Sequence, residues 1–245
     1  MENRFDNLTV GEIVANKPQA ADVFIKLNVD FCCGGRKNFA EVCEKQGKDP
    51  QEVWNEIEAL TQKSSPSLDF KSFEVDFLID YVNNVHHTYL YKNLPEIKFF
   101  VEKVSTKHGE KYLYLNELSA LYLDLEQDLL SHLPKEENII FPYGKALQYA
   151  MKAQQQPDAP FFGTVANPIG VMHHEHERAG EILFRIREIT NNYTPPVDAC
   201  NSHLVMLSKL AELDADLIQH IHIENNILFP KIEALEASFE EQVVN

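Results

Sequence analysis

The 245-residue sequence has little glycine and few basic side chains, and each shortage excludes a class of protein. Nine glycines stand among abundant Leu, Glu, Lys and Ala at helical spacing, and no run of strand-like alternation occurs, so the sequence predicts an all-α fold. Lys and Arg total 22 against 38 Asp and Glu, a net charge of −16 that argues against nucleic acid or an anionic membrane as partner. No apolar run approaches the ~18 residues of a membrane helix.

Cysteine and histidine are each absent from part of the chain. The N-terminal sequence MENRFDNLTVGEI has no apolar core of a signal peptide, so we expect a cytoplasmic protein with reduced thiols and no disulfide framework for its four cysteines. Histidine is missing before His86, whereas three of the four cysteines lie at or before Cys43. This segregation indicates two parts with different chemistry.

The part that lacks histidine is predicted to be a small helical domain. Its helix starts are marked by the capping box Thr9-Val-Gly-Glu, by Pro18 in a first turn, and by the pair Asp49-Pro50. The run Lys63-Ser-Ser-Pro-Ser reads as a linker. We therefore expect two domains, residues 1–66 and residues 67–245.

The second part carries four long helical patterns, which run over residues 73–106, 108–151, 168–191 and 197–236. Short breaks between long helices favour antiparallel neighbours, so we expect an up-down four-helix bundle. Within it, His132-Leu-Pro-Lys-Glu-Glu-Asn-Ile-Ile-Phe-Pro recurs 88 residues later as His220-Ile-His-Ile-Glu-Asn-Asn-Ile-Leu-Phe-Pro, with six of eleven positions identical. The repeat suggests two helix pairs of similar build.

Each repeat places a histidine and a glutamate on one helix face. His132 and Glu136 are four residues apart, as are His220 and Glu224, so the two side chains of each pair lie about 6 Å apart. Both pairs interrupt the apolar stripe that faces the core. A buried, unpaired carboxylate costs several kcal/mol, and two such pairs that point at one bundle axis predict a metal site.

The other two helices are expected to contribute one histidine each. His176 lies on the apolar stripe of the third helix, and the first helix offers His86 or His87, between which periodicity does not choose. From His87 the successive intervals to His132, His176 and His220 are 45, 44 and 44 residues, which returns each antiparallel helix to the same height.

Four histidines and two glutamates suit two metal ions better than one. Each ion would take two histidines, Glu136 and Glu224 would bridge both ions, and an oxo or hydroxo group would complete the bridge. Imidazole and carboxylate ligands favour iron, with manganese as the alternative, over structural zinc. An open coordination position would let such a pair bind O2 or NO, or release iron.

The run Cys32-Cys33-Gly34-Gly35 follows a helix in the N-terminal domain. Its glycines allow close approach of a partner, and adjacent cysteines form a disulfide only through a strained small ring. We therefore expect Cys32 and Cys33 to bind a cofactor such as a metal or NO, or to exchange with another thiol, with simple packing as the alternative. We expect Cys43 to lie in the core and His222 to be exposed.

Together these motifs resemble the repair-of-iron-centres (RIC) family of ScdA-type proteins, which are di-iron proteins with a short Cys-containing N-terminal domain and a hemerythrin-like domain. The Asp-Phe-Cys-Cys-Gly-Gly turn, the two repeats that end in Phe-Pro, and Leu94-Pro95-Glu96 carry the resemblance over nearly the whole chain. The resemblance places the six iron ligands of the family on His87, His132, Glu136, His176, His220 and Glu224. It thereby implies His87 instead of His86.

The resemblance also implies a function, namely repair of iron–sulfur clusters damaged by nitric oxide or oxidants, in a cytoplasmic and often homodimeric protein. Damaged iron–sulfur proteins would be its partners, and NO or O2 its small ligands. Two alternatives stay open from the sequence: a hemerythrin-like carrier or sensor of O2 or NO, and an enzyme that reduces NO to N2O at the iron pair.

Overall fold

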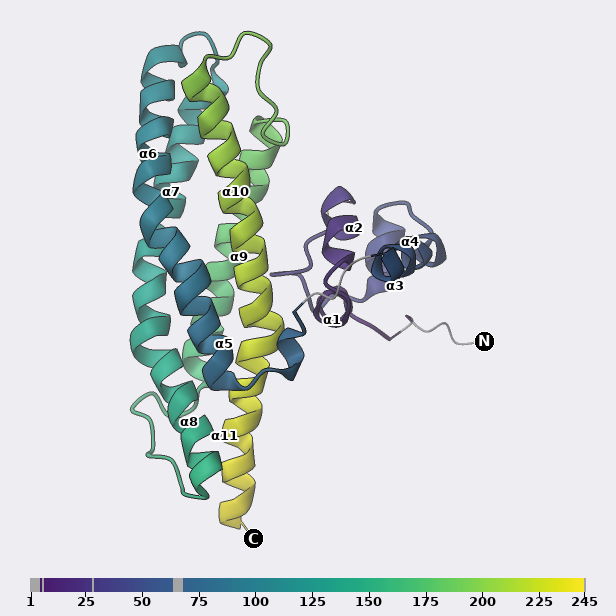
Figure 1. Ribbon diagram of the computed structural model, residues 1–245, viewed down its shortest axis with the longest axis vertical. Helices are drawn as coiled ribbons and strands as arrows, with labels where there is room; N and C mark the ends of the chain where they lie inside the picture. The colour runs from purple at the N-terminus through teal and green to yellow at the C-terminus, as the bar shows by residue number, and fades with distance from the viewer. Residues whose placement is uncertain (1–4, 6, 28, 64–67, 245) are drawn as a thin grey trace. The chain divides into compact units, whose positions relative to one another are not determined.

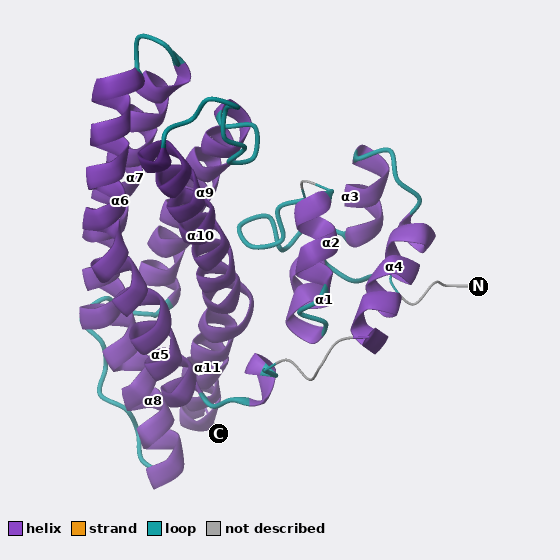
Figure 2. Cartoon of the chain, turned by 45° about the horizontal axis from the view of Figure 1, so that its top comes forward, coloured by secondary structure: helices purple, strands orange, loops and turns teal. Residues whose placement is uncertain are grey.

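The structure is a computed structural model that describes residues 5, 7–27, 29–63 and 68–244. These residues form helices and no strand, which confirms the all-α prediction (Figure 1, Figure 2). None of the described helices is long and apolar enough to cross a membrane. The chain divides into two compact units, Met1–Leu78 with Ile221–Asn245, and Ile79–His220. The predicted domain boundary at residue 66 lies outside the described residues and stays a prediction.

The N-terminal residues of the first unit form four short helices, three of which begin at the predicted starts. Their bounds are α1 (Val10–Asn16), α2 (Ala20–Lys26), α3 (Phe39–Lys45) and α4 (Pro50–Lys63). The predicted capping box starts α1, where the Glu12 carboxylate accepts the Thr9 N–H at 2.9 Å. Asp49 Oδ1 accepts the Gln51 N–H at 2.8 Å at the start of α4. A buried aromatic cluster that includes Phe24 and Phe39, with ring centroids 6.1 Å apart, forms the core between these helices.

The four predicted long helices are present, but three of them are interrupted. After the turn η1 (Phe70–Ser72) the runs are α5 (Val75–Tyr81), η2 (Val82–His87) and α6 (Thr88–His108); α7 (Tyr114–Lys135), η3 (Glu136–Ile140) and α8 (Phe141–Ala153); α9 (Ala166–Ile189); and α10 (Asn201–Ile223), η4 (Glu224–Leu228) and α11 (Phe229–Val244). The segments η2, η3 and η4 are π-helical. Such segments often mark functional sites, and a candidate ligand predicted from the sequence lies in each of them.

An asparagine accompanies each π-helical segment. A π-turn shifts the backbone hydrogen bonds by one residue, which leaves a carbonyl in need of another donor. In each case an asparagine Nδ2 donates to the carbonyl four residues earlier: Asn84 to Asp80 at 2.7 Å, Asn138 to Pro134 at 2.7 Å, and Asn226 to His222 at 3.3 Å. Asn138 and Asn226 are the shared asparagine of the sequence repeat, which gives that position a structural role.

In the second unit, the long helices α6, α7, α9 and α10 lie side by side in both views (Figure 1, Figure 2). An ion pair joins each helix to the next around the bundle: Lys98–Glu126, Arg178–Asp128, Arg187–Asp214 and Lys209–Glu96. The predicted up-down four-helix bundle is therefore confirmed. Inward leucines, histidines and glutamates of its helices are buried, as the apolar stripes predict.

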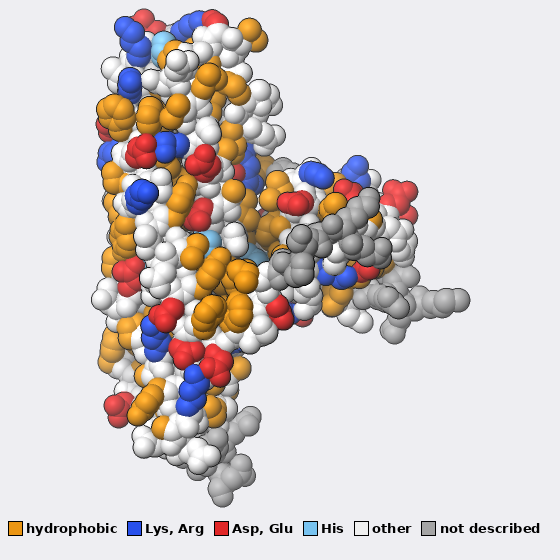
Figure 3. Space-filling model, viewed as in Figure 1, with side chains coloured by type: hydrophobic (Ala, Val, Ile, Leu, Met, Phe, Trp, Pro, Cys, Tyr) orange, Lys and Arg blue, Asp and Glu red, His pale blue; other side chains and the backbone are white. Residues whose placement is uncertain are grey.

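The surface carries the net charge as scattered groups. On the face shown in Figure 3, acidic and basic side chains are interspersed along the helices. Ion pairs between exposed groups, such as Arg185 with Glu117 at 2.6 Å, contribute little to stability in water because solvent screens them. The surface charge thus says little about function, and the buried polar groups are more informative.

Candidate metal centre

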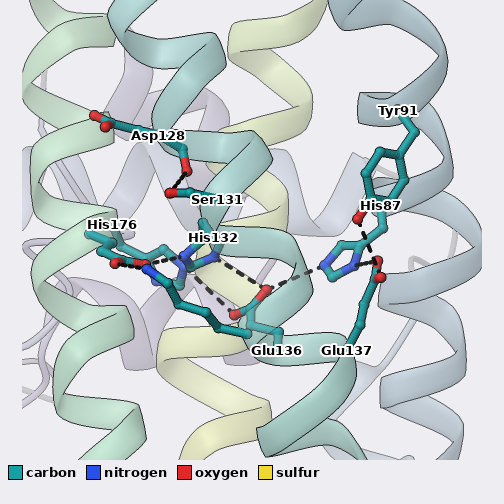
Figure 4. A network of polar contacts seen from close by, with 10 residues as sticks. His87, Tyr91, Asp128, Ser131, His132, Glu136, Glu137 and His176 are labelled. Atoms are coloured by element: carbon teal, nitrogen blue, oxygen red, sulfur yellow. Dashed lines mark hydrogen bonds and ion pairs between the residues drawn. The ribbon is translucent and has the colours of Figure 1, made fainter.

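The centre is built around the carboxylate of Glu136. Glu136 begins η3 one turn after His132, and the two side chains point the same way, with His132 Nε2 3.2 Å from Glu136 Oε2 (Figure 4). His87 comes from η2 on the other side and brings its Nε2 to 3.4 Å from the same oxygen. His176, from the middle of α9, lies 3.9 Å from Oε1 and 3.1 Å from His132 Nε2. One carboxylate thus faces three imidazoles from three helical runs.

His220 and Glu224 complete the set, one turn apart where α10 passes into η4. The ring of His220 lies 5.0 Å from that of His87, and the rings of His132 and His176 are 4.8 Å apart. The potential ligand atoms fall into two groups of four, within each of which all atoms lie within 4.8 Å of one another. These groups are His87, Glu136, His220, Glu224 and His132, Glu136, His176, Glu224. The two groups share both glutamates.

The environment of Glu136 fits a bound cation. Its side chain is fully buried, and neither oxygen accepts a hydrogen bond of ordinary geometry from the described residues. Burial alone would raise the pKa of the Glu136 carboxyl group, but interaction with His132, and then with His87 and His176, holds that pKa well below its ordinary value. A buried carboxylate that stays ionised among imidazoles is a donor set suited to iron.

The same surroundings shift the pKa values of two of the histidines in opposite directions. Burial alone would lower the pKa of His132, whereas the charges of Glu136 and Glu175 raise it to about 9. Burial, followed by the charge of His87, holds the pKa of His220 well below its ordinary value. His220 is thus neutral, which is the form that binds metal.

Two carboxylates that the sequence analysis missed lie behind the candidate ligands. Glu137 Oε1 accepts the Nδ1–H of His87 at 2.8 Å, and Glu175 Oε2 accepts that of His132 at 2.8 Å. Glu175 also contacts the Lys135 ammonium. Their only signal in the sequence is adjacency, since Glu137 follows Glu136 and Glu175 precedes His176. A carboxylate bound to Nδ1 fixes the ring and leaves Nε2 for a metal.

The first long helix buries both of its candidate histidines. His86 and His87 are both 1% exposed, so neither is a surface residue. His87 belongs to one of the two groups of potential ligands, whereas His86 lies beside them with its ring stacked on His220 at 5.1 Å. The expectation of an exposed His222 is wrong, because that residue is 6% exposed and its ring packs against Phe31 at 5.7 Å.

The thiol pair lies in a loop organised by Asp30. Asp30 Oδ1 accepts the N–H groups of Cys32 and Cys33, both at 3.0 Å, and Oδ2 accepts that of Gly34 at 2.8 Å. The two Sγ atoms are 3.7 Å apart, so no disulfide joins them. The hydrogen bond to Cys33, and then burial, raise the pKa of the Cys32 thiol well above its ordinary value.

The three cysteines near the N-terminus differ in how exposed they are to solvent. Cys43 is 1% exposed, as expected of a core residue, whereas Cys33 is partly exposed. Asp30, Cys32 and Cys33 offer ligand atoms within 4.8 Å of one another. The loop can therefore present a thiol to a partner.

Comparisons with known proteins agree with this geometry. A model described as the hemerythrin HHE cation binding domain matches residues 82–232, and the ScdA_N model, described as a domain of unknown function, matches residues 6–61. Similar proteins named iron-sulfur cluster repair protein YtfE include that of Pectobacterium atrosepticum, 33% identical over 227 residues that cover 91% of this chain and 95% of the relative. That of Yersinia pseudotuberculosis is 32% identical, with 93% of this chain and 97% of the relative covered.

The matches span both parts of the chain, and the HHE model contains every residue of the two groups of potential ligands. They identify the buried His and Glu cluster as part of a cation-binding domain of a kind that typically holds iron. The chain therefore belongs to the repair-of-iron-centres (RIC) family that its motifs resemble, the family of the YtfE iron–sulfur cluster repair proteins.

Proposed function

We propose that this protein repairs iron–sulfur clusters damaged by nitrosative or oxidative stress, by donating iron or handling NO at a di-iron centre. The observation that carries the proposal is the fully buried Glu136 shared by two groups of potential ligands. Family membership and the printed function of the relatives support it. The names of the relatives favour repair over the alternatives of an O2 or NO sensor and an NO-reducing enzyme.

In this proposal His87 and His220 bind one iron ion, His132 and His176 bind the second, and Glu136 and Glu224 bridge the two. The sharing of both glutamates by the two groups supports the bridging role. An oxo or hydroxo group would complete the bridge. Such a pair supplies iron for cluster rebuilding and an open position for NO or O2.

Other side chains orient the proposed ligands, exclude water and offer a second binding site. Glu137 and Glu175 fix the orientation of the His87 and His132 rings, respectively, through hydrogen bonds to Nδ1. The buried position of Glu136 excludes water from its carboxylate. Cys32 and Cys33 serve as a binding site for iron or NO in transit between this protein and its client. Damaged iron–sulfur proteins are the proposed partners. Cytoplasmic location and a homodimer remain predictions.

Iron content tests the proposed ligands. Purified, reconstituted protein should hold close to two iron ions per chain, because each group of ligands binds one. Glu136→Gln removes the charge of the shared carboxylate and should lower the content to one or less, measured by mass spectrometry of the metal. The exposed Glu177, on α9, offers the matched control Glu177→Gln, which should retain both ions. One iron ion per wild-type chain, or stoichiometric zinc, would contradict the di-iron proposal.

Recovery of a damaged client tests the function itself. A hydratase whose cluster has been damaged by NO is mixed with the reduced protein, and recovered activity and N2O are measured separately. We expect recovery beyond that given by iron salt alone, with loss of recovery in the Glu136→Gln variant. Cys32→Ser combined with Cys33→Ser should keep the iron spectrum and impair recovery. N2O formation without recovery would contradict repair and favour NO reduction.

A further inference from the structure

His86 is a buried histidine that the six proposed ligands do not include. It lies in η2 directly before His87 and is 1% exposed. In a regular α-helix adjacent side chains point about 100° apart, so one of the two would face away from the core. The π-helical segment instead buries both imidazoles, and His86 belongs to neither group of potential ligands.

A carboxylate fixes the tautomer of His86. Its Nδ1 lies 2.9 Å from Asp216 Oδ1, and Asp216 stands one helical turn before His220 on α10. Because a carboxylate accepts hydrogen bonds, the Nδ1–H of His86 donates to Asp216, and in the neutral ring the lone pair is then on Nε2. The proposed ligands His87 and His132 are held in the same way, by Glu137 and Glu175. His86 thus has the same kind of carboxylate contact as these two proposed ligands.

The other nitrogen of His86 has no partner among the described residues. Nε2 is buried and takes part in no hydrogen bond, which is costly for a polar atom away from water. The ring is parallel to that of His220, with 5.1 Å between centroids and 1° between planes. That spacing is close to the 5.0 Å between His87 and His220. The Tyr81 ring lies edge-on at 5.7 Å from His86.

We infer that His86 is a third imidazole ligand for the iron ion proposed to lie between His87 and His220, an inference that rests on the di-iron proposal. Because His86 lies beside the group of four, its ring must turn toward the ion on metal binding. One ion then has three imidazoles and the other, with His132 and His176, has two. The second ion keeps the more open position, so it binds small ligands and leaves the protein more readily.

The test compares the two irons spectroscopically. Mössbauer spectra of protein loaded with enriched iron should show two quadrupole doublets of equal area, because the two ions differ in nitrogen ligands. His86→Phe keeps the ring volume and removes both nitrogens, and it should shift one doublet only. In the His86→Phe variant, the ion held by His87 and His220 should be released to a chelator at least ~10-fold faster than in the wild type. His203→Phe, which removes a buried histidine elsewhere in the bundle, should change neither measurement.

A second variant keeps the inference testable if His86→Phe fails to fold. Asp216→Asn preserves the volume and removes the charge that fixes His86, so it should shift the same doublet by less. Helicity and the melting temperature of the metal-free variants report folding. Two irons with one common doublet, or unchanged doublets and release rates in both variants, would overturn the role of His86 alone. Fewer than two irons in the wild-type protein would instead overturn the di-iron proposal.

Discussion

At the scale of single residues, carboxylates behind the histidine rings prepare the centre for metal. Glu175 accepts the Nδ1–H of His132, and Glu137 does so for His87, each at 2.8 Å. A ring held through Nδ1 keeps its Nε2 directed at one point, so little rotamer entropy is lost when metal replaces any proton there. The precision of the proposed centre would therefore depend on residues outside its set of ligands.

Replacing one of these carboxylates should weaken iron binding without removing a ligand. Glu175→Gln keeps the size of the side chain but removes the charge that His132 faces, so we expect a ~10–100-fold loss of iron affinity. A competition titration with a ferrous chelator measures it. Glu177→Gln, two residues further along α9 and exposed, is the matched control. Equal affinities in the two variants would show that Glu175 does not orient His132.

The residues of the proposed centre differ in how well the sequence predicted them. Two independent sequence signals, helical periodicity and the internal repeat, both pointed to His132, Glu136, His220 and Glu224. Glu137 and Glu175 carry no such pattern, since an acidic residue beside a ligand is indistinguishable from a solvated one. His222 was predicted wrongly because its burial depends on Phe31, which is far away in the sequence.

At the scale of helices, a π-turn occurs in each run that carries a proposed ligand apart from α9. The extra residue in such a turn changes which side chains face the core after it. In η3, Asn138 donates to the Pro134 carbonyl at 2.7 Å, which offsets the shift of the backbone hydrogen bonds. The sequence predicted the helices but not these turns, because the apolar residues on each side of a turn keep the ordinary helical period.

Removal of the asparagine amide should destabilise the turn and loosen the metal. Asn138→Ala should lower the free energy of unfolding by about 1 kcal/mol, or the melting temperature by ~2–4 °C, and speed iron release from Glu136. Asn93 gives the control, because its amide donates to Tyr89 O at 2.9 Å within the regular helix α6. Asn93→Ala should lower stability similarly and leave iron release unchanged. If both variants release iron equally, the π-turn has no special role.

At the scale of the whole molecule, segments almost 200 residues apart meet within the first unit. The Cys32 carbonyl accepts the side-chain amides of Asn225 and Asn226, at 3.4 and 3.3 Å. Gly11 and Gly35 leave room for the Asn226 side chain, and their backbones are joined by a 2.9 Å hydrogen bond. The helices on both sides were predictable from caps and periodicity. Their meeting was not, because the Cys-Cys-Gly-Gly motif contains no signal for the partner that packs on it.

The close approach at Gly35 gives a prediction about the fold of this unit. A Cβ on Gly35 would lie 2.4 Å from Asn226 Oδ1 and 2.7 Å from the Phe31 carbonyl, and the carbonyl is main chain that cannot simply rotate away. Gly35→Ala should therefore lower the free energy of unfolding by about 1–3 kcal/mol and expose the Cys32 thiol to faster labelling. Calorimetry and thiol labelling measure the two effects.

Gly170→Ala is the control for Gly35→Ala, because the added methyl group meets no neighbour there. Gly170 lies in α9, and a Cβ there would meet nothing within 4 Å, so Gly170→Ala should raise the free energy of unfolding by about 0.5–1 kcal/mol through reduced backbone entropy. The two substitutions add the same methyl group and should shift the melting temperature in opposite directions. If Gly35→Ala were as stable as the wild type, with unchanged labelling of Cys32, then the contact between the thiol loop and Asn226 would not hold this part of the molecule together.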